Sequence, residues 1–331
     1  MENQAQAPQG SGCFKKGCTG CGGAFALLVL LVIGFGLVAL INRPGPEDFQ
    51  SKEITQPLPA LPDTVSSPAE APVTEAAPRA GTLESQELGR SLGGEPVRLV
   101  LRLSKGSFTI TPAPAGSPLK VEADYDTERF VLEQHWDPED RRYDVRFDAK
   151  GGIFSLSGDR RSRERVNILV PRGYPLIIEG KISMGQSRIE LGGLAIQEVD
   201  LDLGMGDHLV AFREPTTVPM QRFSVDGSMG ELEIATLGNA SPLQSRIALS
   251  MGELGANLAG DWRMDAEVEV RCGMGECDVR TPDNVHVVVE RASVGIGESR
   301  SRGGWEAREL PPGRPTLRVR ATGSLGAVTV Y

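Results

Sequence analysis

The stretch Ser228-Met229-Gly230 is one of seven related turn sequences that recur through the C-terminal half of this 331-residue chain. Five copies carry Met-Gly and return every 21 to 24 residues, while two later copies carry Ile296 or Leu325 in place of the methionine. The other six are Ser183-Met184-Gly185, Gly204-Met205-Gly206, Ser250-Met251-Gly252, Gly273-Met274-Gly275, Gly295-Ile296-Gly297 and Ser324-Leu325-Gly326. A period of this size predicts one small unit stacked on copies of itself, because each unit is too small to bury its apolar side alone.

The segments on both sides of each turn alternate apolar and polar residues, as in 246–249 before one turn and 231–234 after another. A two-residue period is typical of a strand with one buried face. Glycine at the turn supplies a positive φ, or a close backbone approach, that a residue with a Cβ atom resists. We therefore predict an all-β fold, a single-stranded β-solenoid with one rung per repeat.

Several stretches around these turns resemble a bacterial family. They are 260–266, 273–280, Pro282-Asp283-Asn284-Val285, 316–320 and 329–330. Over roughly residues 165–331 the chain resembles the toast-rack proteins, which are related to the C-terminal domain of LiaF-type cell-wall antibiotic response proteins. The resemblance implies a toast-rack solenoid and a role in sensing or responding to envelope stress, through a membrane partner such as a sensor kinase. LiaF-type proteins have several membrane spans, whereas this chain carries one candidate span.

The composition suits a turn-rich all-β protein. The chain has 40 glycines and 23 prolines, with 40% hydrophobic but only 5% aromatic residues, so that Val, Ile and Leu would fill its core. The net charge of -9 offers no general footprint for nucleic acid, which requires a basic face. We expect no nucleic-acid partner.

Residues 22–41 contain no charged side chain and are long enough to cross the hydrocarbon core of a bilayer. We interpret them as an uncleaved signal anchor; the competing interpretation is a cleaved signal peptide, but no small-x-small cleavage site follows the run. Lys15 and Lys16 precede it, whereas Glu47 and Asp48 follow it. The positive-inside rule then predicts a single-pass protein of the cell membrane, with residues 1–21 in the cytoplasm and the rest periplasmic or extracellular.

The remainder divides into three regions. Residues 42–96 carry nine prolines and no apolar periodicity, which predicts a disordered linker. Residues 97–164 alternate like strands but lack the Met-Gly turn, so we predict an irregular β region that caps the solenoid of residues 165–331. Leu317–Tyr331 is predicted to form the last rung, leaving an edge open to homomeric contact. Trp305 is expected to fold back over this end or to serve as a ligand platform.

The cysteines follow the same division. Cys13, Cys18 and Cys21 fall in the cytoplasmic segment, where three thiols without a fourth ligand do not complete a zinc site within one chain. Cys272 and Cys277 bracket a turn and replace Leu249 and Leu254 of the preceding repeat, so both should point inward. They could form a disulfide on the oxidising side of the membrane or remain as two buried free thiols.

The position after each turn glycine is mostly acidic. If the rungs stack in register, five consecutive carboxylates should form a column at a spacing of about 4.8 Å: Asp207, Glu231, Glu253, Glu276 and Glu298, with Gln186 and Ala327 as the other occupants of this position. The column could consist of solvated turn residues, bind a cation such as Ca²⁺, or dock a basic partner.

A basic cluster of the opposite sign lies just before the repeats and consists of Arg160, Arg161, Arg163 and Arg165. Such a cluster can grip anionic lipid head groups or phosphate-bearing polymers, although many such runs are solvated loops.

Enzymatic signals are weak. His135, His208 and His286 are far apart in sequence, and none lies beside a nucleophile motif or a metal-ligand spacing. His208 occupies an inward position equivalent to Leu254. We expect no catalytic residue, metal site or cofactor, and predict a membrane-anchored, non-catalytic binding or regulatory module that contacts an envelope protein. The alternatives are a self-assembling structural envelope protein and a β-helix enzyme acting on polysaccharides.

Overall fold

The computed structural model describes residues 49–55, 94–150, 164–302 and 311–331. The predicted membrane span, the three N-terminal cysteines, Trp305 and most of the linker lie outside these ranges, as do Arg160, Arg161 and Arg163 of the basic cluster. In the described ranges, no helix combines the length and the apolar character needed to cross a membrane.

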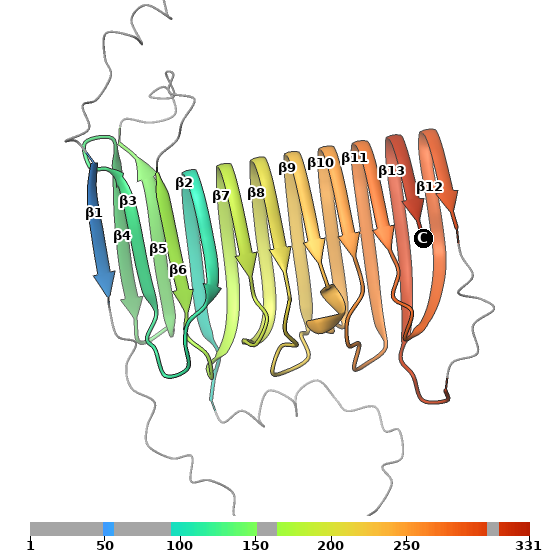
Figure 1. Cartoon of the computed structure of the whole chain (residues 1–331), viewed down its shortest axis with the longest axis horizontal. Helices are drawn as coiled ribbons and strands as arrows, with labels where there is room; N and C mark the ends of the chain where they lie inside the picture. The colour runs from blue at the N-terminus through green and yellow to red at the C-terminus, as the bar shows by residue number, and fades with distance from the viewer. Residues whose placement is uncertain (1–48, 56–93, 151–163, 303–310) are drawn as a thin grey trace, which may run out of the picture. The chain divides into compact units, whose positions relative to one another are not determined.

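The described chain is almost entirely β structure, as the two-residue period predicted. Its long strands are β2 (Val97–Pro112), β7 (Pro175–Glu190), β8 (Ala195–Ala211), β9 (Arg222–Ala235), β10 (Gln244–Asn257), β11 (Ala266–Arg280), β12 (His286–Ser301) and β13 (Thr316–Val330). The shorter elements are β1 (Phe49–Thr55), β3 (Lys120–Asp126), β4 (Phe130–Asp137), β5 (Arg142–Ala149), β6 (Arg165–Val170) and the 3₁₀ turn η3 (Leu237–Asn239). The long strands pair in parallel in one sheet, in the order β2-β7-β8-β9-β10-β11-β13-β12 (Figure 1).

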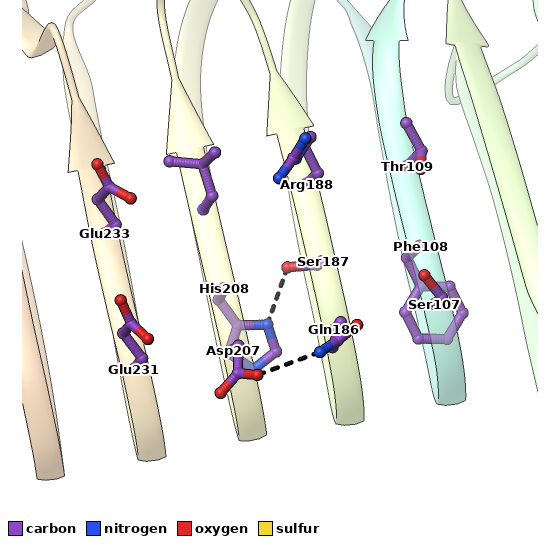
Figure 2. Close-up of a pocket in the computed structure, with 11 residues that line it drawn as sticks. Ser107, Phe108, Thr109, Gln186, Ser187, Arg188, Asp207, His208, Glu231 and Glu233 are labelled. Atoms are coloured by element: carbon purple, nitrogen blue, oxygen red, sulfur yellow. Dashed lines mark hydrogen bonds between the residues drawn. The ribbon is translucent and has the colours of Figure 1, made fainter. Parts of the chain in front are cut away.

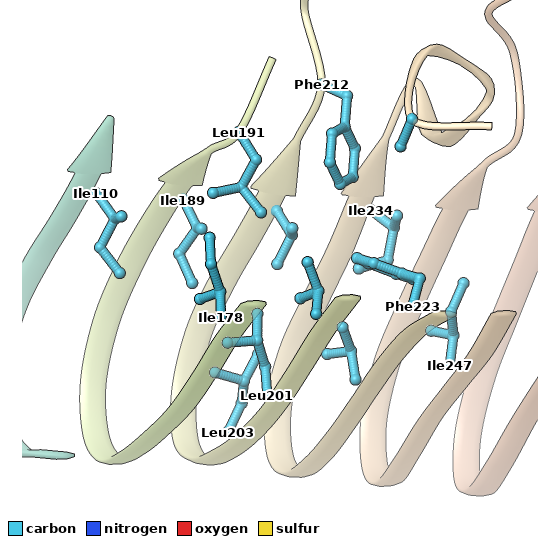
Figure 3. Packing of buried hydrophobic residues seen from close by; sticks show 14 of the residues in the cluster. Ile110, Ile178, Ile189, Leu191, Leu201, Leu203, Phe212, Phe223, Ile234 and Ile247 are labelled. Carbon is cyan, nitrogen blue, oxygen red and sulfur yellow. The ribbon is translucent and has the colours of Figure 1, made fainter. Parts of the chain in front are cut away.

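Each long strand is a rung that folds over at a corner into a first and a second limb; the corner is Met-Gly in β7 to β11, Lys-Gly in β2, Ile-Gly in β12 and Leu-Gly in β13. In β10, Ile247 and Leu249 are buried before the corner, and Leu254 and Ala256 are buried after it. The inward positions therefore change from odd to even residue numbers at the corner, so that both limbs turn their apolar sides to one interior. Figure 3 shows Ile178 and Ile189, from the two limbs of β7, pointing into the space between the limbs.

The corner glycines pair in register from one rung to the next, for example Gly206 with Gly230 and Gly230 with Gly252. Their φ angles are positive, +143° at Gly206 and +129° at Gly252. A Cβ atom on Gly206 would lie 1.7 Å from the carbonyl oxygen of Gly185. Both reasons predicted for glycine, the positive φ and the close backbone approach, therefore apply at these corners.

The solenoid begins earlier than predicted. The sequence indicated an irregular region over 97–164, but β2 is a full rung whose Lys105 and Gly106 pair with Met184 and Gly185. On its other side, β5 pairs with the first limb of β2 and β6 with the second, so together they form a split rung. The antiparallel strands β4 and β3 then pair with β5 and β6 at this end. Lys105-Gly106 reads as a turn in the sequence, but with lysine in place of methionine it does not match the Met-Gly pattern, so β2 was not predicted to be a rung.

β1 is a second departure from the prediction, because residues 42–96 were expected to have no regular structure. Phe49–Thr55 pairs antiparallel with β3. The edge of β3 offers unpaired backbone groups, which a passing segment can pair with whatever its side chains are.

The prediction that β13 is the last rung is wrong. β13 lies between β11 and β12, so β12 ends the sheet (Figure 1). The inward residues explain the order: Val328 and Val330 of β13 are fully buried, whereas β12 has Ser299 and Ser301 at the paired positions. A rung with serines on its inner face suits the end of a stack, because an end rung is covered on one side only.

Candidate functional site

The acidic column exists, but it is shorter than predicted. Asp207 pairs with Glu231, Glu231 with Glu253, and Glu253 with Glu276, so four carboxylates occupy consecutive rungs in register. Because β13 lies between β11 and β12, Ala327 separates Glu276 from Glu298. From here on, the acidic column denotes these four residues.

Three carboxylates of the column have no partner among the described residues: the side chains of Glu231, Glu253 and Glu276 form no hydrogen bond or ion pair there. At the start of the column, Gln186 Nε2 donates to Asp207 Oδ2 at 3.2 Å, and beyond its end Glu298 pairs with Arg300 at 2.5 Å. Exposed carboxylates about 4.8 Å apart repel one another, so this surface favours a positively charged contact.

On the outer face of the first limbs, several charges are paired between rungs. Lys181 Nζ lies 2.7 Å from Asp202 Oδ2, and Arg222 Nη2 lies 2.9 Å from Glu198 Oε2. Near the C-terminal end, Glu290 accepts from both Arg318 and Arg320. Beside the corners on the second-limb face, by contrast, three consecutive carboxylates have no ion-pair partner among the described residues.

A metal site finds no support at the column. In the parts of the chain that the structure describes, no three His, Cys, Asp or Glu side chains are grouped to hold a metal ion. The reason is geometric: the carboxylates stand side by side on successive strands instead of converging on one point, as the six to eight oxygen ligands of Ca²⁺ must.

An apolar surface runs beside the acidic column and was missed by the sequence interpretation. The corner residues pair in register along the sheet. We call this row the corner ridge: Met184, Met205, Met229, Met251, Met274, Leu325 and Ile296. Met184 is half-buried, the next five are 41% to 48% exposed, and Ile296 is 70% exposed. The recurring methionine was visible in the sequence, but the corner was explained by its glycine alone.

The fold does not require apolar residues at the corner. Lys105 occupies the equivalent position of β2 and pairs in register with Met184. Each ridge residue is followed by glycine and preceded by serine or glycine, so neighbouring side chains are too small to cover it. Exposed apolar residues in a continuous row are uncommon on soluble proteins and mark contact surfaces.

A cavity of about 400 Å³ adjoins the N-terminal end of the column, across the second limbs of β2 and β7 to β9 (Figure 2). Its lining includes Ser107, Arg188, Asp207 and Glu231. Below this surface, Ser187 Oγ and His208 Nδ1 lie 2.8 Å apart, and both residues are buried. His208 faces inward, as its equivalence to Leu254 predicted.

Ser187 and His208 do not form a catalytic triad. In a triad the imidazole bridges the serine and a carboxylate with its two nitrogens. Here Nε2 of His208 has no hydrogen-bond partner among the described residues, and the adjacent Asp207 is exposed and accepts from Gln186 instead. The pair takes the place of two core side chains, since Leu232 and Leu254 follow at the same position in β9 and β10.

We expect the buried His208 to make stability depend on pH. Burial lowers its pKa below the ordinary value of 6.5, and the negative charge of Asp207 offsets part of this effect. The unfolded chain then binds a proton before the folded chain does, so stability is lost as the pH falls from 6.5 through the folded pKa, by up to about 1.4 kcal/mol per pH unit. Urea unfolding at pH 5 to 8 measures this slope.

The control is the double variant Ser187→Val/His208→Leu, which replaces both polar partners with apolar residues. Its free energy of unfolding at pH 8 should be close to that of the wild type. The part of the pH dependence of stability that His208 causes should be absent. A variant with the wild-type slope would contradict the assignment.

Cys272 and Cys277 face each other from the two limbs of β11, both buried, as their equivalence to Leu249 and Leu254 predicted. The structure has free thiols at both positions. A hydrogen bond to Cys272, together with burial, raises the pKa of the Cys277 thiol. Thiols in this environment lack both the charge and the access that redox chemistry needs.

Of the basic cluster, the described residues include only Arg165, which is exposed at the start of β6 and pairs in register with Ser107 and Asp124. It lies on the split rung, three rungs before Asp207. The described residues therefore do not bring the cluster together with the acidic column.

Solved structures with weak similarity to this chain include three bacterial proteins. A candidate cell adhesion protein from Clostridium sporogenes is 14% identical, with 72% of this chain and 93% of that chain covered and a TM-score of 0.36. A candidate lipid binding protein from Parabacteroides distasonis is 11% identical, with 86% and 98% covered and a TM-score of 0.37. A candidate adhesin from Bacteroides fragilis is 9% identical, with 72% and 93% covered and a TM-score of 0.34. No protein-family model and no protein of curated function matches the chain. Similarity at this level assigns no function to it.

Proposed function

We propose that this protein is a non-catalytic docking module of the cell envelope. One membrane span at residues 22–41 holds it in the cell membrane, and the solenoid faces the periplasm or the exterior. There it binds an envelope protein and takes part in sensing envelope stress. The membrane anchor rests on the uncharged N-terminal run, and the stress role on the resemblance to toast-rack and LiaF-type proteins.

The observation that carries the docking function is the corner surface, which we define as the corner ridge together with the acidic column. An apolar row supplies the burial that drives association, and methionine side chains adapt to the shape of a partner. The unpaired carboxylates make the surface negatively charged. This charge contributes more to the choice of partner than to the binding affinity. Neither row is needed for the fold, since Lys105, Ser107 and Ala327 occupy equivalent positions.

Photo-crosslinking in the native host cells tests this function. A photoreactive residue at Ser250 lies beside the ridge, whereas one at Arg246 lies on the outer face of the first limb. We expect Ser250 to capture one defined envelope protein, Arg246 to capture none, and the capture to disappear in the variant Met229→Lys/Met274→Lys. Capture at both positions, or at neither, would reject the corner surface as a docking site.

Self-assembly is the second candidate, and the end of the sheet favours it. Among the described residues, β12 pairs only with β13, so one edge of a sixteen-residue strand is unpaired. Its Val288 is 43% exposed. Unpaired edges are templates for adding another strand. Capture of only the protein's own copies from Ser299, at this edge, would support assembly through β12.

A further inference from the structure

The corner ridge is a straight repeat with a defined spacing. It crosses seven consecutive rungs from Met184 of β7 to Ile296 of β12, in register throughout. Rungs of a parallel sheet are about 4.8 Å apart, so six steps make a row of about 29 Å. A partner that contacts the whole row must place apolar groups at nearly this spacing.

An α-helix laid across the rungs meets this requirement better than an extended strand. One helical turn rises about 5.4 Å, so its apolar stripe presents one contact per rung with a mismatch of about 0.6 Å per step. Over the whole ridge the mismatch stays below one rung spacing. An extended segment repeats its side chains on one face every 6.7 Å or so, which exceeds the rung spacing by about 2 Å at each step.

The two flanks of the ridge differ in charge. On the second-limb side, Glu231, Glu253 and Glu276 have no basic partner among the described residues. On the first-limb side, the adjoining residues are Ser228, Ser250 and Gly273, which carry no charge. A helix on the ridge would therefore meet negative charge along one of its sides only.

We propose that the corner surface binds a basic amphipathic α-helix of a partner protein, about 19 residues long, that lies across the rungs. Its apolar stripe packs on the corner ridge, and Lys or Arg residues along one side of the stripe face the acidic column. This inference rests on the proposed docking function and specifies the chemistry of the partner.

Synthetic peptides test the inference with the full chain in nanodiscs of zwitterionic lipid, by fluorescence anisotropy. The probe is a 19-residue helical peptide with a Leu stripe and Lys along one side. One control peptide has Glu in place of Lys, and another has the same composition with the stripe scrambled. We expect the basic helix to bind at least tenfold more tightly than either control, and less tightly at high salt, because salt screens exposed charges. Empty nanodiscs measure binding to lipid alone.

Substitutions in the corner surface test whether the peptide binds there. Met229→Lys/Met251→Lys should weaken binding at least tenfold, and Lys105 shows that a corner accepts lysine without loss of the fold. Glu231→Gln/Glu253→Gln/Glu276→Gln should remove most of the salt dependence. The matched controls are Val288→Lys, which changes an exposed apolar residue of β12, and Glu267→Gln on the first limb of β11. Both controls should bind as the wild type does.

The result that overturns the inference is equal binding of all three peptides, or binding that the ridge variants leave unchanged. Crosslinking separates this failure from failure of the proposed function. In one outcome, a photoreactive residue at Ser250 captures one envelope protein through a segment that is not a basic amphipathic helix. That result would support the proposed docking function and contradict the helical partner. If Ser250 captures nothing and the peptides do not bind, both proposals fall.

Discussion

Replacing Gly252 with alanine should unfold the stack around β10, with a loss of more than about 4 kcal/mol in the free energy of unfolding. The added Cβ atom would lie 1.9 Å from the carbonyl oxygen of Gly230, and the φ of Gly252 is +129°. The neighbouring rung cannot move away, because its own corner backbone is hydrogen-bonded into the sheet on both sides. The strain at a positive φ adds to the clash. Urea unfolding followed by circular dichroism measures the loss.

Gly255→Ala is the matched control, three residues further along the same strand. The nearest atom to its new Cβ is Glu233 Cγ at 4.0 Å, so the change should alter stability by no more than about 1 kcal/mol. Equal effects of the two substitutions would show that the close approach at the corner does not set the requirement for glycine.

Phe223→Ala is the second large effect that we expect, a loss of about 3 to 5 kcal/mol. Phe223 is fully buried in the first limb of β9, and its ring meets that of Phe212 edge to face with centroids 5.7 Å apart. Its neighbours in register are Val199 and Ser245, both smaller. The cavity would persist, because the backbone of each rung is held by its neighbours at a set spacing.

Phe223→Leu serves as the comparison, since it keeps most of the apolar volume and should cost less than about 1.5 kcal/mol. Thermal and urea unfolding of both variants give the two values. A loss of less than about 1 kcal/mol in the free energy of unfolding for Phe223→Ala would mean that the interior collapses around the gap. That result would contradict the expectation that neighbouring rungs hold the backbone at a set spacing.

The sequence alone was enough to predict which residues of a repeat face inward and where its strand turns. The alternation around Met251 predicted the inward residues Leu249 and Leu254, and the structure confirms both. The same alignment placed His208 and Cys277 inside, again correctly. These predictions succeeded because a two-residue period and a turn glycine are properties of a single rung, which its own residues determine.

The order of the rungs was decided by the tertiary structure. Sequence order placed β13 last, but fully buried valines at 328 and 330 require cover on both sides, while Ser299 and Ser301 of β12 do not. That choice also separates Glu298 from the acidic column. That β2 is a rung was missed for a related reason: Lys105 satisfies a corner because its backbone pairs with β7, whatever its side chain is.

Some features of the corner surface could likewise be predicted from the sequence, whereas others depend on the tertiary structure. By itself, the sequence determined which residues recur at the corner and which follow the turn glycine, because those positions are counted along one strand. Only the tertiary structure decided that seven apolar corners form one row in which six are exposed, that four carboxylates stand consecutively beside it, and that three of these carboxylates lack a partner among the described residues. The physical reason is that exposure and pairing depend on atoms brought together from different rungs, and the register between rungs is a property of the assembled sheet.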